Sequence, residues 1–261
     1  MGILRLLYRL PWILLHLLVG LPLTLLSFTS WARAVRVGGR PLNDIVPNWW
    51  AGMICSIFGL KLNIHGGFQP GALLVVANHI SWLDIPLLRS AFLMSFVSKG
   101  EVKKWPLVGL MASASDTVFH QRGSHDSASG VSIVMAERLQ QGMKVAIFPE
   151  GGILPGHGVK RFHARLFAAA IETCSPVQPV MIRYLIDGHH DPDKTFNPGE
   201  YFMANVFRLL KQKSCTAQVV VLPVIDPAGK KRRELAMESE SAVRAAFERD
   251  NGSDDVESAH G

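Results

Sequence analysis

Hydrophobic and polar residues follow three different patterns along the chain. Residues 11–28 form an almost unbroken apolar run, residues 49–60 form a second that opens with two tryptophans, and from residue 61 short apolar runs alternate with polar turns. As a helix the first run would be about 27 Å long, enough to cross a hydrocarbon core, whereas the second is too short. Because tryptophan favours the membrane interface, we expect residues 1–60 to form two apolar helices that anchor the chain in or along a membrane.

Two other interpretations of this region stay open. The first run has a basic start and is followed by the small-residue site Ala32-Arg33-Ala34, as in a signal peptide, although its length and the nearby Trp31 argue against cleavage. The second run could be a buried core helix. Arginines flank the first run at both ends, so the positive-inside rule predicts no orientation for it.

The alternation after residue 60 predicts an α/β fold. Short β-branched runs indicate strands, and longer amphipathic stretches indicate helices. Strands are expected at residues 61–65, 73–77, 96–98, 116–119, 144–148, 177–184 and 218–224. Helices are expected at residues 85–92, 126–141 and 162–173, and after the basic cluster at 230–233 as far as about residue 249. This order predicts a mixed, largely parallel sheet covered by helices over residues 61–226, and then a basic helical segment with a disordered tail over 227–261.

Composition narrows the possible partners. The chain of 261 residues is 48% hydrophobic, only 18% charged and carries a net charge of +6, a combination that suits the surface of an anionic membrane. Nucleic acid is a poor alternative, because no basic stretch lies in a known reader motif. The three cysteines are far apart and form no CxxC, so we expect reduced thiols, with no disulfide frame and no metal site.

The segment NHISWLD at residues 78–84 carries the clearest chemical signal. It follows the apolar strand expected at 73–77 and precedes a proline suited to a first helical turn. His79 therefore lies at a strand end and Asp84 near a helix start, where the carboxylate can fold back onto a ring nitrogen. A base held by an acidic partner can activate a hydroxyl. By itself, a structural histidine is the more common explanation.

Three further segments follow or begin strands. Arg122 lies in VFHQRG and could bind phosphate or carboxylate, or could be a solvated surface arginine. Glu150 and Gly151 lie in FPEGG, where the carboxylate could accept backbone N–H bonds or hold a basic partner. The segment VQPV at 177–180 could shape a pocket wall. GxSxG and Walker motifs are absent from the sequence, and His189-His190-Asp191 is expected to be a surface loop, not a metal site.

Together these four segments resemble the lysophospholipid acyltransferase family, the 1-acylglycerol-3-phosphate acyltransferases. NHISWLD resembles its NHxxxxD block, VFHQRG its arginine block, FPEGG its FPEG block and VQPV its last block, and all four occur in the family's order. The pattern also resembles the bacterial branch that acylates lyso-ornithine lipid. The family commonly has threonine or serine after FPEG, where this chain has Gly152 and Ile153.

The resemblance implies a reaction and a set of roles. A fatty acyl group would pass from acyl-CoA or acyl-ACP, with no bound cofactor, to a lysolipid hydroxyl, foremost that of 1-acylglycerol-3-phosphate to give phosphatidic acid. His79 would be the general base and Asp84 its orienting partner. The polar head of the acceptor would be bound by Asn78, Arg122, Glu150 and Gly151. Two basic residues, Lys160 and Arg161, could replace the head-group contact that is missing at Gly152 and Ile153.

The resemblance also implies a location in the cell. Two other functions stay open. The enzyme would lie at a membrane, the bacterial inner membrane, with its active site on the cytoplasmic face. A non-catalytic lipid-binding protein would associate with lipid and transfer nothing. A thioesterase or phospholipase would use the same base with water as the acceptor.

Overall fold

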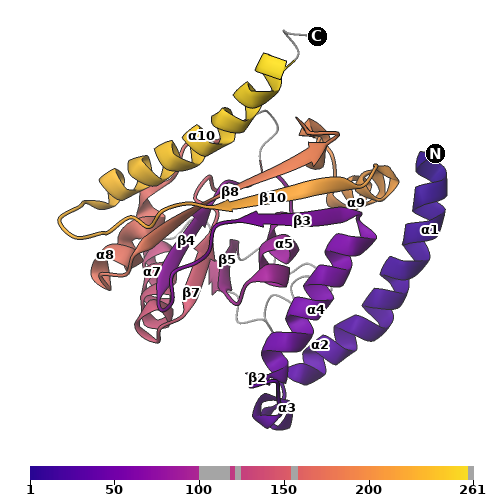
Figure 1. The fold of residues 1–261 in the computed structure, drawn as a ribbon. Coiled ribbons are helices and arrows are strands. Elements are labelled where there is room, and N and C mark those ends of the chain that lie inside the picture. Colours follow the sequence, from indigo (N-terminus) through magenta and orange to yellow (C-terminus); the bar gives the residue numbers. More distant parts are fainter. Residues whose placement is uncertain (100–117, 121–124, 154–157, 258–261) are drawn as a thin grey trace.

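The computed structural model describes residues 1–99, 118–120, 125–153 and 158–257. In this part of the chain one eight-stranded sheet carries helices on both faces (Figure 1). Its strands are β3 (Leu60–His65), β4 (Leu73–Ala77), β5 (Ser95–Lys99), β6 (Val118–His120), β7 (Lys144–Ile147), β8 (Val177–Ile186), β9 (His189–His190) and β10 (Cys215–Val221).

The order of the strands places β4 in the middle of the sheet. The path runs β3-β10-β8-β4-β7-β5-β6, and β9 pairs with β8. β4 is parallel to both β8 and β7, and β5 continues the parallel arrangement to β6. β10 is antiparallel to β8 and parallel to β3. The predicted mixed, largely parallel sheet is therefore confirmed, and the carboxyl ends of β4, β7 and β8 lie along one edge.

Each face of the sheet has its own hydrophobic core. Leu74 and Val76 of β4 pack with the helices α7 (His125–Gln140), α8 (Ala168–Glu172) and α10 (Arg232–Glu257). The alternate residues Leu73 and Val75 pack with α4 (Leu42–Ile57), α5 (Asp84–Ala91) and α9 (Phe202–Lys211). Because successive side chains of a strand point to opposite faces, a strand covered on both sides reads as the unbroken apolar run seen in the sequence.

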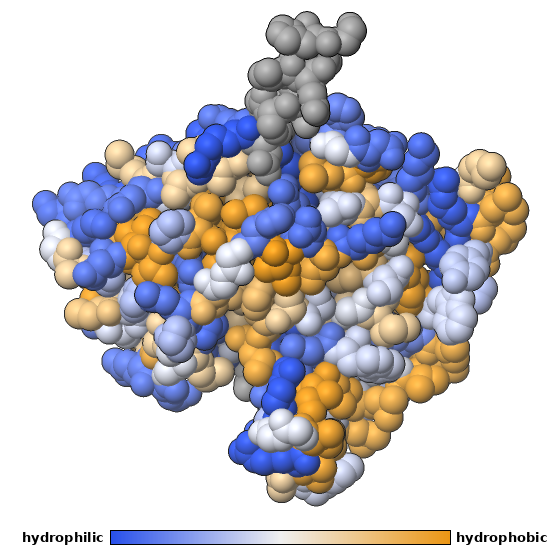
Figure 2. Space-filling model, viewed as in Figure 1, coloured by the Kyte–Doolittle hydropathy of each residue, from blue (hydrophilic) through white to orange (hydrophobic). Residues whose placement is uncertain are grey.

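The chain begins with one continuous helical stretch of 26 residues, Gly2–Ser27. It consists of α1 (Gly2–Leu15), the π-helical turn η1 (His16–Gly20) and α2 (Leu21–Ser27), and is long and apolar enough to cross a membrane by length and composition. A short helix α3 (Ser30–Ala34) and a hairpin of β1 (Arg36–Val37) and β2 (Arg40–Pro41) lead into α4. Apolar residues over α1 and α2 form the lower right edge of the molecule in Figure 2.

Several elements differ from the sequence prediction. α4 begins at Leu42, well before residue 49, because Pro41 is extended and Asp44 in the first turn suits a helix N-terminus. The segment expected as a helix from residue 162 starts as the 3₁₀ turn η3 (Ala164–Phe167). The last strand lies three residues earlier than predicted. The 3₁₀ turn η4 (Pro192–Lys194) and α9 were not predicted, and α10 continues as helix to Glu257, past the expected end near residue 249.

Candidate active site

Asn78 fixes the point at which β4 turns into the NHISWLD segment. Its side-chain amide donates to the carbonyl oxygen of Ile182 at 2.9 Å, and its side-chain oxygen accepts from the Ile182 N–H at 2.8 Å. The side chain thus takes the place of one more backbone hydrogen-bonded pair between β4 and β8. It is 1% exposed. With one hydrogen bond to Ile182 at each end of its amide, Asn78 positions the turn, and its part in substrate binding stays a prediction.

Asp84 lies at the centre of a dense hydrogen-bond network. Its Oδ2 accepts from the Nδ1 of His79 at 2.9 Å and from the N–H groups of Ile80 and Ser81 at 2.8 and 3.0 Å. Its Oδ1 accepts from the Tyr184 hydroxyl at 2.6 Å. The side chain is fully buried in the first turn of α5, where the helix dipole favours a negative charge. Because a carboxylate only accepts, the His79 proton lies on Nδ1 and Nε2 is left with the lone pair that a base needs.

Tyr184 is a site residue that sequence reasoning missed. It lies on β8, a hundred residues from Asp84, and is completely buried. Burial and the neighbouring negative charge of Asp84 raise the pKa of the Tyr184 hydroxyl well above its usual range. The hydroxyl therefore stays protonated and remains a donor to Asp84. A buried tyrosine in a mostly apolar strand needs a hydrogen-bond partner, and this need is the trace of the role that the sequence carries.

Two residues that follow β7 pack directly on His79. The Phe148 ring stacks on the imidazole with 4.0 Å between ring centroids. Glu150 accepts from the N–H of His79 at 3.4 Å and from the N–H of Lys160 at 3.1 Å. Burial raises the pKa of the Glu150 carboxyl to about 7, although the two N–H groups oppose the shift. Glu150 thus links the His79 turn to the segment at residues 158–160.

A small cavity of about 20 Å³ lies beside His79. Three of its lining residues, His79, Glu150 and Lys160, were singled out in the sequence. The others come from distant segments and include His190, Thr195 and Phe247. The sequence predicted a surface loop at His190, which instead lies in β9 paired with β8, and nothing in the local sequence sets Thr195 or Phe247 apart, because the fold alone brings β9, the segment after η4 and α10 to this edge.

The remaining predicted site residues lie in different surroundings. Gly151 has a φ of 78°, and a Cβ there would approach the His163 ring to 3.2 Å, so glycine suits this tight turn. Arg161 is exposed and is absent from the cavity lining. Arg122 lies outside the described residues. Within the described ranges no group of three His, Cys, Asp or Glu residues is placed to hold a metal ion.

The cysteines take no part in this arrangement. Cys55 and Cys215 are buried thiols, and Cys174 is exposed. Burial raises the pKa of the Cys55 thiol to about 12 and raises that of Cys215 as well, so both stay protonated. His79 and Asp84 form a base–carboxylate pair at this sheet edge, of the kind that can activate a hydroxyl or a water molecule.

Known proteins share the sequence and the fold. A family model described as Acyltransferase matches residues 61–183. The lyso-ornithine lipid O-acyltransferase of Pseudomonas aeruginosa is 36% identical over 88% of this chain and 90% of its own length. The 1-acyl-sn-glycerol-3-phosphate acyltransferase of Neisseria meningitidis serogroup B is 31% identical over 80% and 83%. The crystal structure of the 1-acyl-sn-glycerophosphate acyltransferase PlsC from Thermotoga maritima has a TM-score of 0.68 at 23% identity and covers 95% of each chain.

A histidine paired with a buried carboxylate at one edge of a doubly covered sheet fits the class of enzymes that transfer a group to an activated hydroxyl or to water. The extent and identity of the sequence matches show the family as well: the chain belongs to the acyltransferase family.

Proposed function

We propose that this acyltransferase moves a fatty acyl group from an acyl thioester to the free hydroxyl of a lysolipid, with His79 as general base. The observation that carries the proposal is the hydrogen bond from His79 Nδ1 to the buried Asp84, since it leaves Nε2 as the basic nitrogen. The relatives from Pseudomonas and Neisseria, both named for acylation of a lysolipid, support the reaction class.

The chemistry proceeds as direct transfer. His79 Nε2 takes the proton of the lysolipid hydroxyl as its oxygen attacks the thioester carbonyl. The new C–O ester bond forms, the C–S bond breaks, and the leaving thiolate takes the proton back from the imidazolium. Asp84 stabilises the transient positive charge on the ring, and Tyr184 holds Asp84 in place. No acyl-enzyme is required.

The acceptor's head group would lie against the residues around the His79 cavity. Lys160 lines this cavity, and its N–H group is held by Glu150. Arg122 stays a proposed head-group ligand from the family's arginine block. Arg161, which is exposed, would contact only the outer part of a head group.

Two acceptors fit this proposal. The first is 1-acylglycerol-3-phosphate, the substrate in the names of the Neisseria and Thermotoga proteins. The second is a lyso-ornithine lipid, which is favoured by two observations. Gly152 and Ile153 replace a common polar position of the family, and the Pseudomonas and Rhodobacter capsulatus relatives, at 36% and 32% identity, are both named for this acceptor.

The exposed apolar face of the helical stretch Gly2–Ser27, formed by α1, η1 and α2, supports a place at the membrane. Leu7 and Leu18 are 63% and 75% exposed, whereas the polar Arg9, His16 and Thr24 of the same stretch are buried against the protein. We propose that this face lies in the bilayer of a bacterial inner membrane, with the active site on the cytoplasmic side. The acyl donor, acyl-CoA or acyl-ACP, would then come from the aqueous phase.

A panel of lysolipids tests the function and the acceptor together. Purified enzyme in anionic vesicles is given acyl-CoA or acyl-ACP with lysophosphatidic acid, lyso-ornithine lipid or lysophosphatidylethanolamine, and products are read by mass. The proposal expects a diacyl product from at least one of the first two acceptors. Fatty acid release without any acceptor would indicate a thioesterase, and lipid binding without transfer from either donor would indicate a non-catalytic protein.

A further inference from the structure

A second hollow, much larger than the cavity at His79, lies on the protein surface. It encloses about 520 Å³ and is lined by His163, Ala164 and Arg165 around η3 and by Arg232 and Arg233 at the start of α10. Four of its five lining residues have basic side chains. They come from two separate segments, so the hollow results from packing of α10 against η3 and not from one run of charges.

Among the described residues, the arginines of this hollow have no acidic partner. Arg165, Arg232 and Arg233 are exposed and make no ion pair or side-chain hydrogen bond that involves a described residue. By contrast, the neighbouring Lys230 is paired with Glu238 at 2.8 Å. Cations are also unfavourable in the first turn of a helix, where the dipole is positive. Contacts with the described residues therefore do not account for Arg232 and Arg233, whereas a bound anion would be stabilised by both.

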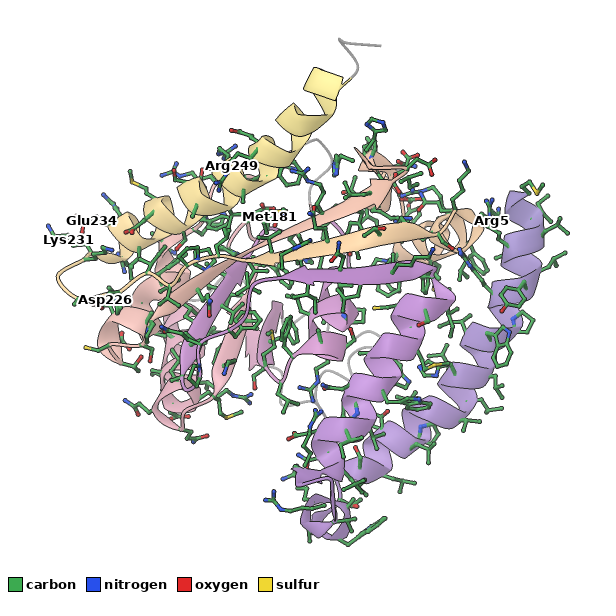
Figure 3. The ribbon with its side chains drawn as sticks, in the orientation of Figure 1. Arg5, Met181, Asp226, Lys231, Glu234 and Arg249 are labelled. Atoms are coloured by element: carbon green, nitrogen blue, oxygen red, sulfur yellow. The ribbon has the colours of Figure 1, made fainter. Side chains whose placement is uncertain are left out.

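The position of the hollow argues against a lipid head group as that anion. Figure 3 places Lys231, next to Arg232, and Arg5 of α1 at opposite ends of the molecule. The apolar face of α1 and α2 is the surface suited to the bilayer, so the hollow faces the aqueous phase. Its ligand is accordingly a soluble anion.

Residues of the hollow and residues of the His79 cavity are separated by roughly the length of the phosphopantetheine arm. Lys160 of the His79 cavity and Arg165 of the hollow are five residues apart, so their Cα atoms are separated by at most about 17 Å. Along α10, Arg233 and Phe247 of the His79 cavity are about 21 Å apart. The phosphopantetheine arm of coenzyme A and of carrier proteins has roughly thirteen bonds between sulfur and phosphorus, or roughly 17 Å when extended.

We propose that the basic hollow formed by Arg165, Arg232 and Arg233 binds the phosphate end of the phosphopantetheine arm of the acyl donor. The thioester at the other end of the arm then reaches His79. This inference rests on the proposed acyl transfer and adds to it separate entrances for the two substrates: the lysolipid comes from the bilayer side and the donor from water.

Single substitutions combined with three donors test the inference. The variants are Arg165→Gln, Arg232→Gln and Arg233→Gln, with Arg249→Gln as a control, because Arg249 is an exposed arginine of α10 bonded only to the Ala245 carbonyl of its own helix. The donors are acyl-CoA, acyl-ACP and acyl-pantetheine, which lacks the phosphate.

Each variant of the hollow is expected to raise the KM for phosphate-bearing donors about threefold or more, since each removes one charge-assisted contact. The kcat, the KM for the lysolipid and the KM for acyl-pantetheine are expected to stay at the wild-type values. A response to acyl-CoA alone or to acyl-ACP alone supports the inference and identifies the source of the phosphate.

Two results would overturn the inference. One is an unchanged KM for both phosphate-bearing donors, and the other is an equal rise for acyl-pantetheine. Calorimetric binding of coenzyme A against pantetheine supplies a readout without turnover. If the wild-type enzyme transferred no acyl group from any donor, the proposed function would be wrong. If coenzyme A bound equally well to wild type and to Arg232→Gln, the proposed role of the hollow would be wrong.

Discussion

At the scale of single residues, the site depends on how Asp84 is held. Its two oxygens accept hydrogen bonds from His79, Ile80, Ser81 and Tyr184, and the side chain is shielded from water. A carboxylate fixed on both sides keeps the imidazole in one tautomer and one orientation. The sequence predicts the pair of His79 and Asp84 from their spacing, but not Tyr184, because that contact depends on the register of β8 beside β4.

Tyr184→Phe isolates the effect of that contact. We expect kcat to fall about tenfold with an unchanged KM, because Asp84 loses one orienting donor while the phenyl ring still fills the space. The free energy of unfolding is expected to fall by about 2 kcal/mol, the contribution of a buried hydrogen bond to a charged group. Steady-state kinetics and denaturant unfolding measure both. Tyr201→Phe, at a residue 85% exposed, is the matched control, and equal kinetics for the two variants would contradict the role of Tyr184.

Glu150 predicts a pH dependence with a definite sign. Its pKa is about 7 in the folded protein, against an ordinary 4.5, so the folded state favours the protonated form. The stabilisation that the protonated Glu150 carboxyl gives the folded state is present in full below pH 4.5 and is lost as the pH rises through 7. Between pH 5 and pH 8 the loss amounts to about 2 to 3 kcal/mol.

Glu150→Gln is expected to remove this loss. The free energy of unfolding of the variant, relative to wild type, should increase by about 2 to 3 kcal/mol from pH 5 to pH 8. Glu238→Gln, at a half-exposed surface residue, should show no such change. Parallel stability curves for wild type and Glu150→Gln would mean that the Glu150 carboxyl ionises normally.

At the scale of elements, α1 is fixed to the catalytic domain through α9. The Arg9 guanidinium donates to the carbonyl oxygens of Leu210 and Gln212 at 3.1 and 2.9 Å, and to the Ser214 hydroxyl at 3.3 Å. α9 in turn holds the NHISWLD segment, because the Trp82 indole donates to Asn205 at 3.1 Å. The apolar helix and the catalytic turn are therefore joined by one short element.

Arg9→Met tests this connection. Loss of the guanidinium leaves the carbonyls at the end of α9 without their donor, and we expect the free energy of unfolding to fall by about 2 to 3 kcal/mol. Arg5→Met on the same helix removes a single exposed bond of 3.2 Å to Lys211 and is expected to cost under about 0.5 kcal/mol. Similar losses for the two variants, measured in the same detergent, would show that α1 is not fixed in this way.

Sequence patterns predict some elements better than others, for physical reasons. β4 and β7 are apolar runs bounded by turns, and their predicted ranges agree with the structure to within a residue. α9 has a different origin. Its residues 202–211 follow a stretch rich in proline and charge, and its stability comes from the Glu200–Arg208 ion pair and from packing of Leu209 and Leu210 in the core. The apolar residues of this segment do recur at helical spacing, at Phe202, Val206, Leu209 and Leu210, so the pattern indicates a helix that is easily passed over because the segment has only ten residues.

At the scale of the whole molecule, the apolar edge formed by α1 and α2 lies far from the start of α10 (Figures 1 and 2). This separation gives the protein one surface suited to lipid and another suited to water. The apolar character of this edge could be predicted from hydropathy, whereas α4, expected as a second anchoring helix, buries one face in the core of the domain. The basic hollow could not be predicted, because it requires Arg165 and Arg232 to meet across the fold.

Leu18→Asp is expected to weaken binding to anionic vesicles at least tenfold, because burying a carboxylate among lipid chains costs about 3 kcal/mol. Leu18 is 75% exposed on the apolar edge. Met237→Asp on α10, at a residue 70% exposed, is the control and should bind vesicles like wild type. Vesicle co-sedimentation measures both, and equal binding by the two variants would place the membrane surface elsewhere.

The central claim is that His79 activates the hydroxyl of a lysolipid for attack on a thioester. Release of free thiol from acyl-CoA or acyl-ACP, followed with and without lysolipid in anionic vesicles, tests it most directly. Wild type should release thiol only when a lysolipid acceptor is present, and His79→Ala, with an unfolding transition like that of wild type, should reduce this rate by about a thousandfold or more. Acceptor-dependent thiol release at the wild-type rate in His79→Ala would contradict the account.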